Sequence, residues 1–200
     1  MQTAQIIETA LANSYTYSEY TNLIHKLYAE RKTTGFNQSE AYLEYTKLGI
    51  SRMKRWDKTA KLSTGVIAKI KQITIPQTWI VITEAWCGDA AHALPIIAKL
   101  AETNPLLNLR IVLRDENEAL MDAFLTNGKK SIPKMIAFTP KNLKVLFTWG
   151  PRPKGATNLV EEELAKGGGI TTEAKEALQM WFNKDKGKQI AEEITELALM

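Results

Sequence analysis

The side chain best suited to covalent chemistry is the thiol of Cys87, the single cysteine among the 200 residues of this chain. It lies in the segment Trp86-Cys87-Gly88-Asp89-Ala90, where an apolar, strand-like run gives way to a helix-like one. A cysteine at the first turn of a helix meets unpaired backbone N–H groups and the positive end of the helix dipole, and both favour the thiolate. We therefore expect Cys87 to be reactive. Because the chain has no second cysteine, any redox chemistry must use a sulfur atom from a partner.

Cys87 has three chemical interpretations. As a nucleophile it would form a mixed disulfide with a disulfide-containing protein or a glutathione-like thiol, and a second thiol would release the product. As a peroxide-reducing or regulatory thiol it would be oxidised to a sulfenic acid, but no threonine and arginine pairing is evident beside it. As a buried residue it would pack like a small hydrophobe. The charge of Asp89 opposes the thiolate while favouring the helix start, so the sequence leaves the direction of the cysteine pKa shift open.

Other polar residues near this segment are weaker candidates. Glu84, three residues before the cysteine, is expected to be a solvated loop carboxylate. His92, five residues after the cysteine, lies only partly on the same side of the helix, which favours a surface or packing role. Arg114 and Asp115, at the end of a predicted strand, either pair locally or touch the site surface. Arg152 is expected to be part of a structural turn, with reach toward an external anion as the alternative.

Composition narrows the class of protein. A hydrophobic content of 44% can form one core with a subdomain, and the net charge of +4 comes from interspersed residues rather than a basic stripe, so we expect no nucleic acid partner. The N-terminal residues lack the features of a signal peptide, and no apolar run reaches a membrane span of about 18 residues. We therefore expect a cytoplasmic protein without a membrane partner. One cysteine and two distant histidines predict no metal site, and no motif predicts a cofactor.

Residues 1–72 are predicted to form a helical extension that packs on the core. Apolar residues recur every three or four positions along a helix that begins near Ser18. A second helix is expected from about Ser39. Its predicted buried side comprises Tyr42, Leu43, Tyr45, Leu48 and either Ile50 or Met53.

Residues 73–200 are predicted to form the main domain. Its expected strands are 79–83, 107–113, 134–138 and 143–149, and its expected helices are 88–103 with an interruption at Pro95, 117–125, 158–166, a helix from about 171 and a helical tail over 184–200. The first strand has no polar alternation, as expected of a strand covered on both faces. The order of strands and helices indicates one α/β unit with a mixed sheet.

Across about residues 74–150 the sequence resembles the thioredoxin family. The family signature is W-C-G-P-C at a strand-to-helix junction, and Trp86, Cys87 and Gly88 reproduce its first three positions. Pro95 occupies the position of the proline in the family's active-site helix, and the segment 131–134, Ser-Ile-Pro-Lys, is similar to the family's cis-proline loop. The resemblance implies a thioredoxin-like fold, a mixed central sheet flanked by helices, here with an N-terminal helical extension and a long C-terminal helix.

The resemblance also implies roles for the residues of the loop. Cys87 would attack the substrate disulfide, and the loop at Ile132 and Pro133 would hold the substrate backbone by strand addition. Trp86, Gly88 and Asp89 would shape the docking surface.

Two departures from the family pattern change the expected mechanism. Ala90 stands where the family has its second cysteine, and Val81 stands where it has a buried acidic residue. The first hypothesis is therefore a thiol–disulfide oxidoreductase that acts through one cysteine by a mixed-disulfide mechanism. The alternative is a thioredoxin-fold module that binds a peptide or protein without turnover.

Overall fold

A mixed sheet in the order β2-β1-β3-β4 forms the centre of the molecule, as the computed structural model, which describes residues 3–167 and 169–200, shows. The central strand β1 (Gln77–Thr83) is buried along its whole length. It runs parallel to β2 (Leu107–Leu113) and antiparallel to β3 (Lys134–Phe138), and β4 (Val145–Trp149) pairs with the far side of β3. Because β1 has neighbours on both sides and helices over it, its apolar run is continuous.

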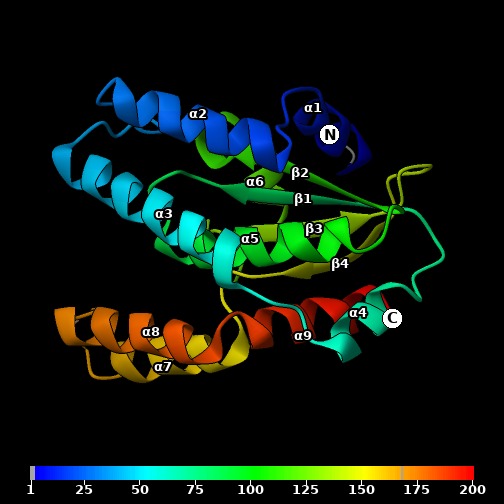
Figure 1. Ribbon diagram of the computed structural model, residues 1–200. Helices are drawn as coiled ribbons and strands as arrows, with labels where there is room; N and C mark the ends of the chain where they lie inside the picture. Colours follow the sequence, from blue (N-terminus) through cyan, green and yellow to red (C-terminus); the bar gives the residue numbers. More distant parts are fainter. Residues whose placement is uncertain (1–2, 168) are drawn as a thin grey trace.

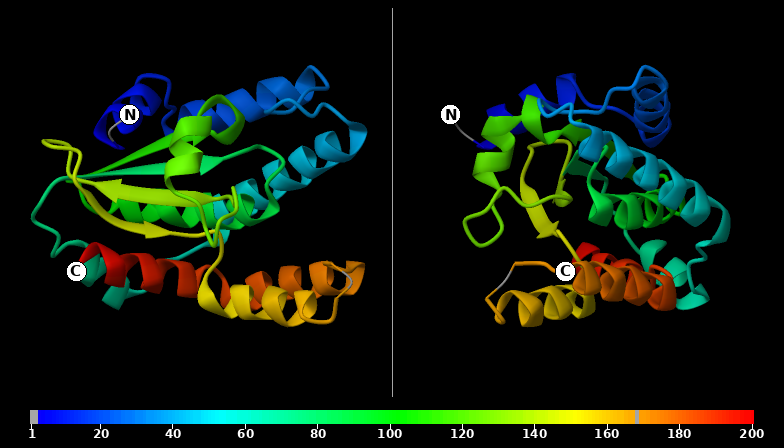
Figure 2. Two further views of the ribbon diagram at one scale, coloured as in Figure 1. Left: turned by 180° about the vertical axis from the view of Figure 1, so that it is seen from behind. Right: turned by 90° about the vertical axis from the view of Figure 1, so that its left-hand side faces the viewer.

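Helices cover both faces of this sheet, which confirms the predicted α/β class. α5 (Gly88–Glu102) lies across one face, and the short helix α6 (Glu118–Ala123) lies on the other (Figures 1 and 2). α9 (Lys188–Ala198) packs beside α5 and against β4. α5 is continuous through Pro95, where the sequence predicted an interruption.

The N-terminal part of the described chain is helical, as predicted. Its helices are α1 (Thr3–Ala12), α2 (Tyr17–Ala29), α3 (Glu40–Thr59) and α4 (Thr64–Ile70). α2 begins one residue earlier than predicted, because Thr16 and Glu19 form a reciprocal capping box. Between α1 and α2, Tyr15 exchanges backbone hydrogen bonds of 2.8 and 2.7 Å with Ile111 and so covers the edge of β2.

The buried face of α3 differs from the prediction. Tyr45 and Leu48 are each 46% exposed, and α3 buries a different stripe. The buried residues of the helix are Leu43, Thr46, Gly49, Met53 and Trp56. The reason lies at Gly49, where a Cβ atom would be 3.0 Å from the carbonyl oxygen of Ala85. The glycine lets α3 approach the loop before Cys87, and this contact fixes the rotation of the helix.

Two of the C-terminal helices form a hairpin, and the last one packs against the sheet. α7 (Lys154–Leu164) and α8 (Thr172–Asp185) pack side by side and project beyond the sheet, with α8 facing α3 (Figure 1). The chain then turns through Lys186 and Gly187, both in the left-handed region, before α9. The helical tail predicted over 184–200 is therefore the last two residues of α8 followed by a separate helix. Within the described ranges, no helix combines the length and apolar composition that crossing a bilayer requires.

A glycine at the end of β4 directs the chain toward the cysteine loop. Gly150 has φ +110°, and a Cβ atom there would collide with the carbonyl oxygen of Pro133. Pro151 and Arg152 come directly after this turn, and their positions depend on it.

We expect Gly150→Ala to lower the free energy of unfolding by about 2–3 kcal/mol, because left-handed strain and the collision with Pro133 add together. Gly128→Ala is the matched control, since Gly128 has φ +72° with no atom within 4 Å of a Cβ. It should lose only about 1 kcal/mol. Urea denaturation measures both values. Equal losses would show that the approach to Pro133 carries no energetic weight.

Candidate active site

Cys87 is the N-cap residue of α5, directly after the loop that leaves β1. Its Sγ accepts the backbone N–H of Ala90 at 3.4 Å, and its thiol donates to the carbonyl oxygen of Ile132, also at 3.4 Å. The peptide bond from Ile132 to Pro133 is cis. The sequence segments 86–90 and 131–134, far apart in the chain, therefore meet at the sulfur atom.

Cys87 is only 7% exposed, and burial determines its protonation. Burial, and next the charge of Asp89, raise the pKa of the Cys87 thiol from 9.0 to about 12. The N–H groups of Ala90 and Asp89 and the charge of Arg152 lower the pKa, as a helix N-terminus should, but by less. Burial thus outweighs the stabilisation of the thiolate that the helix N-terminus was expected to give. Cys87 is therefore a protonated thiol at neutral pH.

Asp89 forms an ion pair inside the site rather than facing solvent. Its carboxylate lies 2.6 Å from a guanidinium nitrogen of Arg152, and the side chains of Arg152 and Asp89 are 21% and 13% exposed. Burial raises the pKa of Asp89, and the charges of Arg152 and Arg52 act against that rise. Arg152 is therefore more than the turn residue that the sequence predicted, because it supplies the counter-charge for the buried Asp89 carboxylate.

A pocket of about 440 Å³ opens onto the cysteine. Its walls come from α3, the start of α5, the Ile132 loop, the turn after β4 and α8. The lining residues are Tyr42, Tyr45, Leu48, Arg52, Trp86, Cys87, Gly88, Asp89, His92, Ile132, Arg152, Ile170, Lys175, Leu178, Gln179 and Phe182. The pocket thus contains every predicted site residue except Pro133, which is buried and does not line it.

The N-terminal extension contributes the part of this pocket that sequence reasoning missed. Tyr42 packs on the Trp86 ring at a centroid distance of 4.8 Å, and the Arg114 guanidinium lies 4.9 Å from the same ring. Tyr45 and Leu48, predicted to be core residues, line the pocket instead. Nothing in the sequence signals this role, because it depends on which face of α3 meets α5.

Glu84 is buried, which corrects the prediction of a solvated carboxylate. It is 1% exposed, and its Oε1 accepts the backbone N–H of Asp115 at 2.9 Å. The loop before α3 covers it, where Thr34 Oγ1 accepts the N–H of Ala85 at 2.7 Å. Burial raises the pKa of Glu84. Arg114 and Asp115 form the predicted local ion pair, at 2.8 Å, and Arg114 also contacts the site at Trp86, which was the other predicted alternative.

His92 packs at the back of the pocket. Its ring stacks on Phe182 with centroids 4.1 Å apart, and its Nδ1 accepts the indole N–H of Trp56 at 2.9 Å. Burial, followed by the charges of Arg52 and Arg55, lowers the pKa of His92 to about 3. The ring is therefore neutral at physiological pH and acts as a packing element between α3, α5 and α8.

Comparison with known proteins identifies the family. A thioredoxin family model matches residues 35–166 of the chain. The chain belongs to the thioredoxin family. The match begins in the loop before α3, so it includes α3 and α4 as well as the sheet. The domain boundary between residues 72 and 73 stays a prediction.

Solved structures similar to this thioredoxin-family protein share its fold. One is a protein of unknown function from Pseudomonas aeruginosa, with 14% identity, a TM-score of 0.58, and coverage of 92% of this chain and 96% of that one. Another is an HIV epitope scaffold, with 13% identity, a TM-score of 0.56, and coverage of 86% and 95%. A search of curated proteins found no match. At these identities the likeness concerns the fold alone.

Replacing Asp89 tests the electrostatic control of the thiol. Since the charge of Asp89 raises the pKa of Cys87, Asp89→Asn should lower that pKa and speed alkylation by iodoacetamide at pH 8 about tenfold. Glu102→Gln is the control, because it removes a carboxylate from the same helix roughly 20 Å away. An unchanged rate in Asp89→Asn would contradict this assignment.

The buried histidine predicts a pH dependence of stability. Between about pH 3 and 6.5 the unfolded chain binds a proton at His92 that the folded protein does not, because the pKa is lowered on folding. The free energy of unfolding should therefore fall with decreasing pH below 6.5, by at most about 1.4 kcal/mol per pH unit from this group. His92→Gln should have a shallower slope between pH 5 and 6.5 in urea denaturation. His25→Gln, at an exposed position of α2, should keep the wild-type slope.

Proposed function

We propose that this protein is a thiol–disulfide oxidoreductase that acts through Cys87 alone by a mixed-disulfide mechanism. The observation that carries the proposal is the position of Sγ. It lies at the start of α5, 3.4 Å from the Ile132 carbonyl oxygen beside a cis proline, in the wall of a pocket large enough for a ligand.

The exchange proceeds in two steps. The Cys87 thiol loses its proton to solvent, the thiolate attacks one sulfur of the incoming disulfide, and the other sulfur leaves as a thiolate that takes up a proton. A second thiol molecule, of the glutathione type, then attacks the mixed disulfide and regenerates Cys87. This second step is external because Ala90 occupies the position one turn along the helix. We propose that a reducing compartment such as the cytoplasm supplies this thiol.

A second candidate function is binding without turnover. It is favoured by the low exposure of Cys87 and by its raised pKa, since the thiolate is the reacting form and is scarce at neutral pH. In this alternative the pocket holds a partner or ligand and the sulfur serves only as part of the wall.

Incubation with glutathione disulfide separates the two functions. We expect intact-protein mass spectrometry to show one glutathione adduct at Cys87, formed slowly at pH 7 and about tenfold faster for each added pH unit up to pH 9. Cys87→Ser should form no adduct. Protein unfolded in urea is the reference for an accessible thiol. If the unfolded chain reacts and the folded chain forms no adduct even at pH 9, the exchange function is wrong and the binding function remains.

A further inference from the structure

Arg52 places an unpaired cation in the pocket. The guanidinium lies over the start of α5, with Nη1 3.2 Å from the position that a Cβ atom on Gly88 would take. In the described part of the chain it makes no direct hydrogen bond or ion pair, and the Asp89 carboxylate acts on it only through its charge. A cation beside a helix N-terminus is electrostatically unfavourable, since the helix dipole is positive at that end. An anion bound between them would satisfy both.

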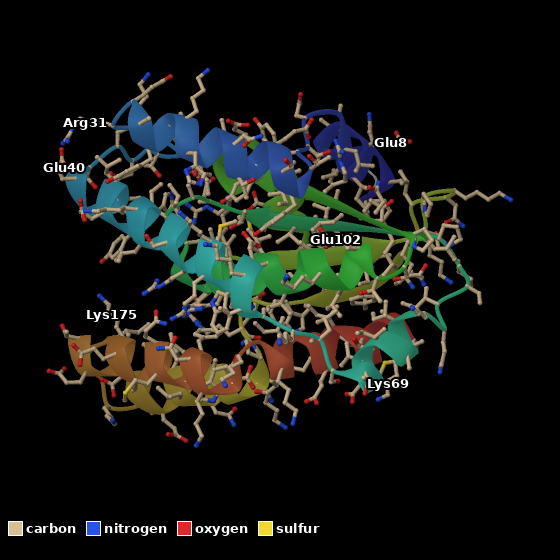
Figure 3. All side chains as sticks on the ribbon, viewed as in Figure 1. Glu8, Arg31, Glu40, Lys69, Glu102 and Lys175 are labelled. Carbon is tan, nitrogen blue, oxygen red and sulfur yellow. The ribbon has the colours of Figure 1, made fainter. Side chains whose placement is uncertain are left out.

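The charged groups that line the pocket are unbalanced. Among the described lining residues, Arg52, Arg152 and Lys175 are cationic and only Asp89 is anionic. The Asp89 carboxylate is already paired with Arg152 at 2.6 Å. Figure 3 shows Lys175 on the side of α8 that faces α3. The pocket therefore carries an excess of positive charge that no side chain in its wall compensates.

Polar atoms in the wall are short of partners as well. Trp86 Nε1 and Arg152 Nε are buried donors without an acceptor. These atoms have almost no exposed area, so we assign neither of them a direct contact with a ligand. They show that hydrogen-bonding groups of the wall lack protein partners.

The shape of the pocket favours a small molecule over a protein chain. Aromatic and aliphatic side chains from α3 and α8, among them Tyr45, Leu48 and Phe182, close two sides of it. With Cys87 only 7% exposed, a disulfide held in a folded protein has little access to the sulfur. A volume of about 440 Å³ is within the range of small-ligand sites.

We propose that this pocket binds a small organic anion, with Arg52 as the partner of a carboxylate and the walls of α3 and α8 around the body of the ligand. This inference rests on the proposed function and gives it a substrate class, a carboxylate-bearing disulfide of low molecular weight. Arg52 positions the ligand, and Cys87 exchanges with its sulfur.

Three disulfides of different charge test the preference. Wild-type protein should form its mixed disulfide about tenfold faster with anionic glutathione disulfide than with neutral hydroxyethyl disulfide, and slowest with cationic cystamine. Arg52→Met should reduce the ratio between the first two rates about tenfold. The ratio cancels any change in thiol pKa, because both reactions use the same thiolate. Lys58→Met removes a charge from an exposed position of the same helix and should keep the wild-type ratio.

A second experiment separates this inference from the exchange reaction. S-methylglutathione cannot exchange, and we expect it to bind the Cys87→Ser protein in calorimetry, at least tenfold more weakly after Arg52→Met. If the Cys87→Ser protein binds S-methylglutathione but the wild-type protein forms no mixed disulfide with any of the three reagents, the exchange function is wrong and the anion site remains supported. Mixed disulfides formed at equal rates with all three reagents would overturn the anion site alone. If S-methylglutathione does not bind and the three disulfides react without a charge preference, the inference is overturned.

Discussion

The close approach of α3 to the loop before Cys87 determines the geometry of the site. It occurs at Gly49, where the helix backbone lies against the Ala85 carbonyl oxygen. One turn before and after this contact, α3 presents Tyr45 and Arg52 to the pocket, and Tyr42 reaches Trp86. A larger residue at position 49 would push α3 outward, which would open the pocket and expose the sulfur. Burial, to which this packing contributes, and the charge of Asp89 raise the pKa of the thiol.

Two charged side chains near the sulfur also control its protonation. Asp89 raises the pKa of Cys87 and Arg152 lowers it, while the two side chains neutralise each other. Arg152 reaches this position only because Gly150 turns the chain past Pro133. Two loops from distant parts of the sequence therefore set the reactivity of one thiol. Arg52 adds a second cation whose charge acts on the same Asp89 carboxylate.

Local pattern was enough to predict the sheet and the position of the cysteine. The apolar run of β1, the helix start at Gly88 and the proline segment before β3 each carry their signal within a few residues. The face of α3 was predicted wrongly because the hydrophobic stripe of Tyr45 and Leu48 competes with a glycine contact visible only in three dimensions. The burial of Glu84 depends on Thr34, some fifty positions earlier, so no local rule reveals it.

The pair of Asp89 and Arg152 was missed for the same physical reason. Each residue has a plausible local role, in a helix first turn and in a proline-rich turn. They meet because β3 pairs with β1 and β4 pairs with β3, which brings the ends of β1 and β4 to the same edge of the sheet. Long-range electrostatic partners leave no periodic mark in a sequence. The sequence therefore indicated which residues belong to the site, but not which of them interact with each other.

The indole of Trp56 fixes the tautomer of His92. Since Nδ1 accepts that hydrogen bond and the ring is neutral, the imidazole hydrogen must reside on Nε2. The Gln179 side chain, which acts on this ring through a hydrogen bond, therefore meets a donor and not a lone pair. A tryptophan outside the pocket thereby decides which kind of atom this imidazole can recognise.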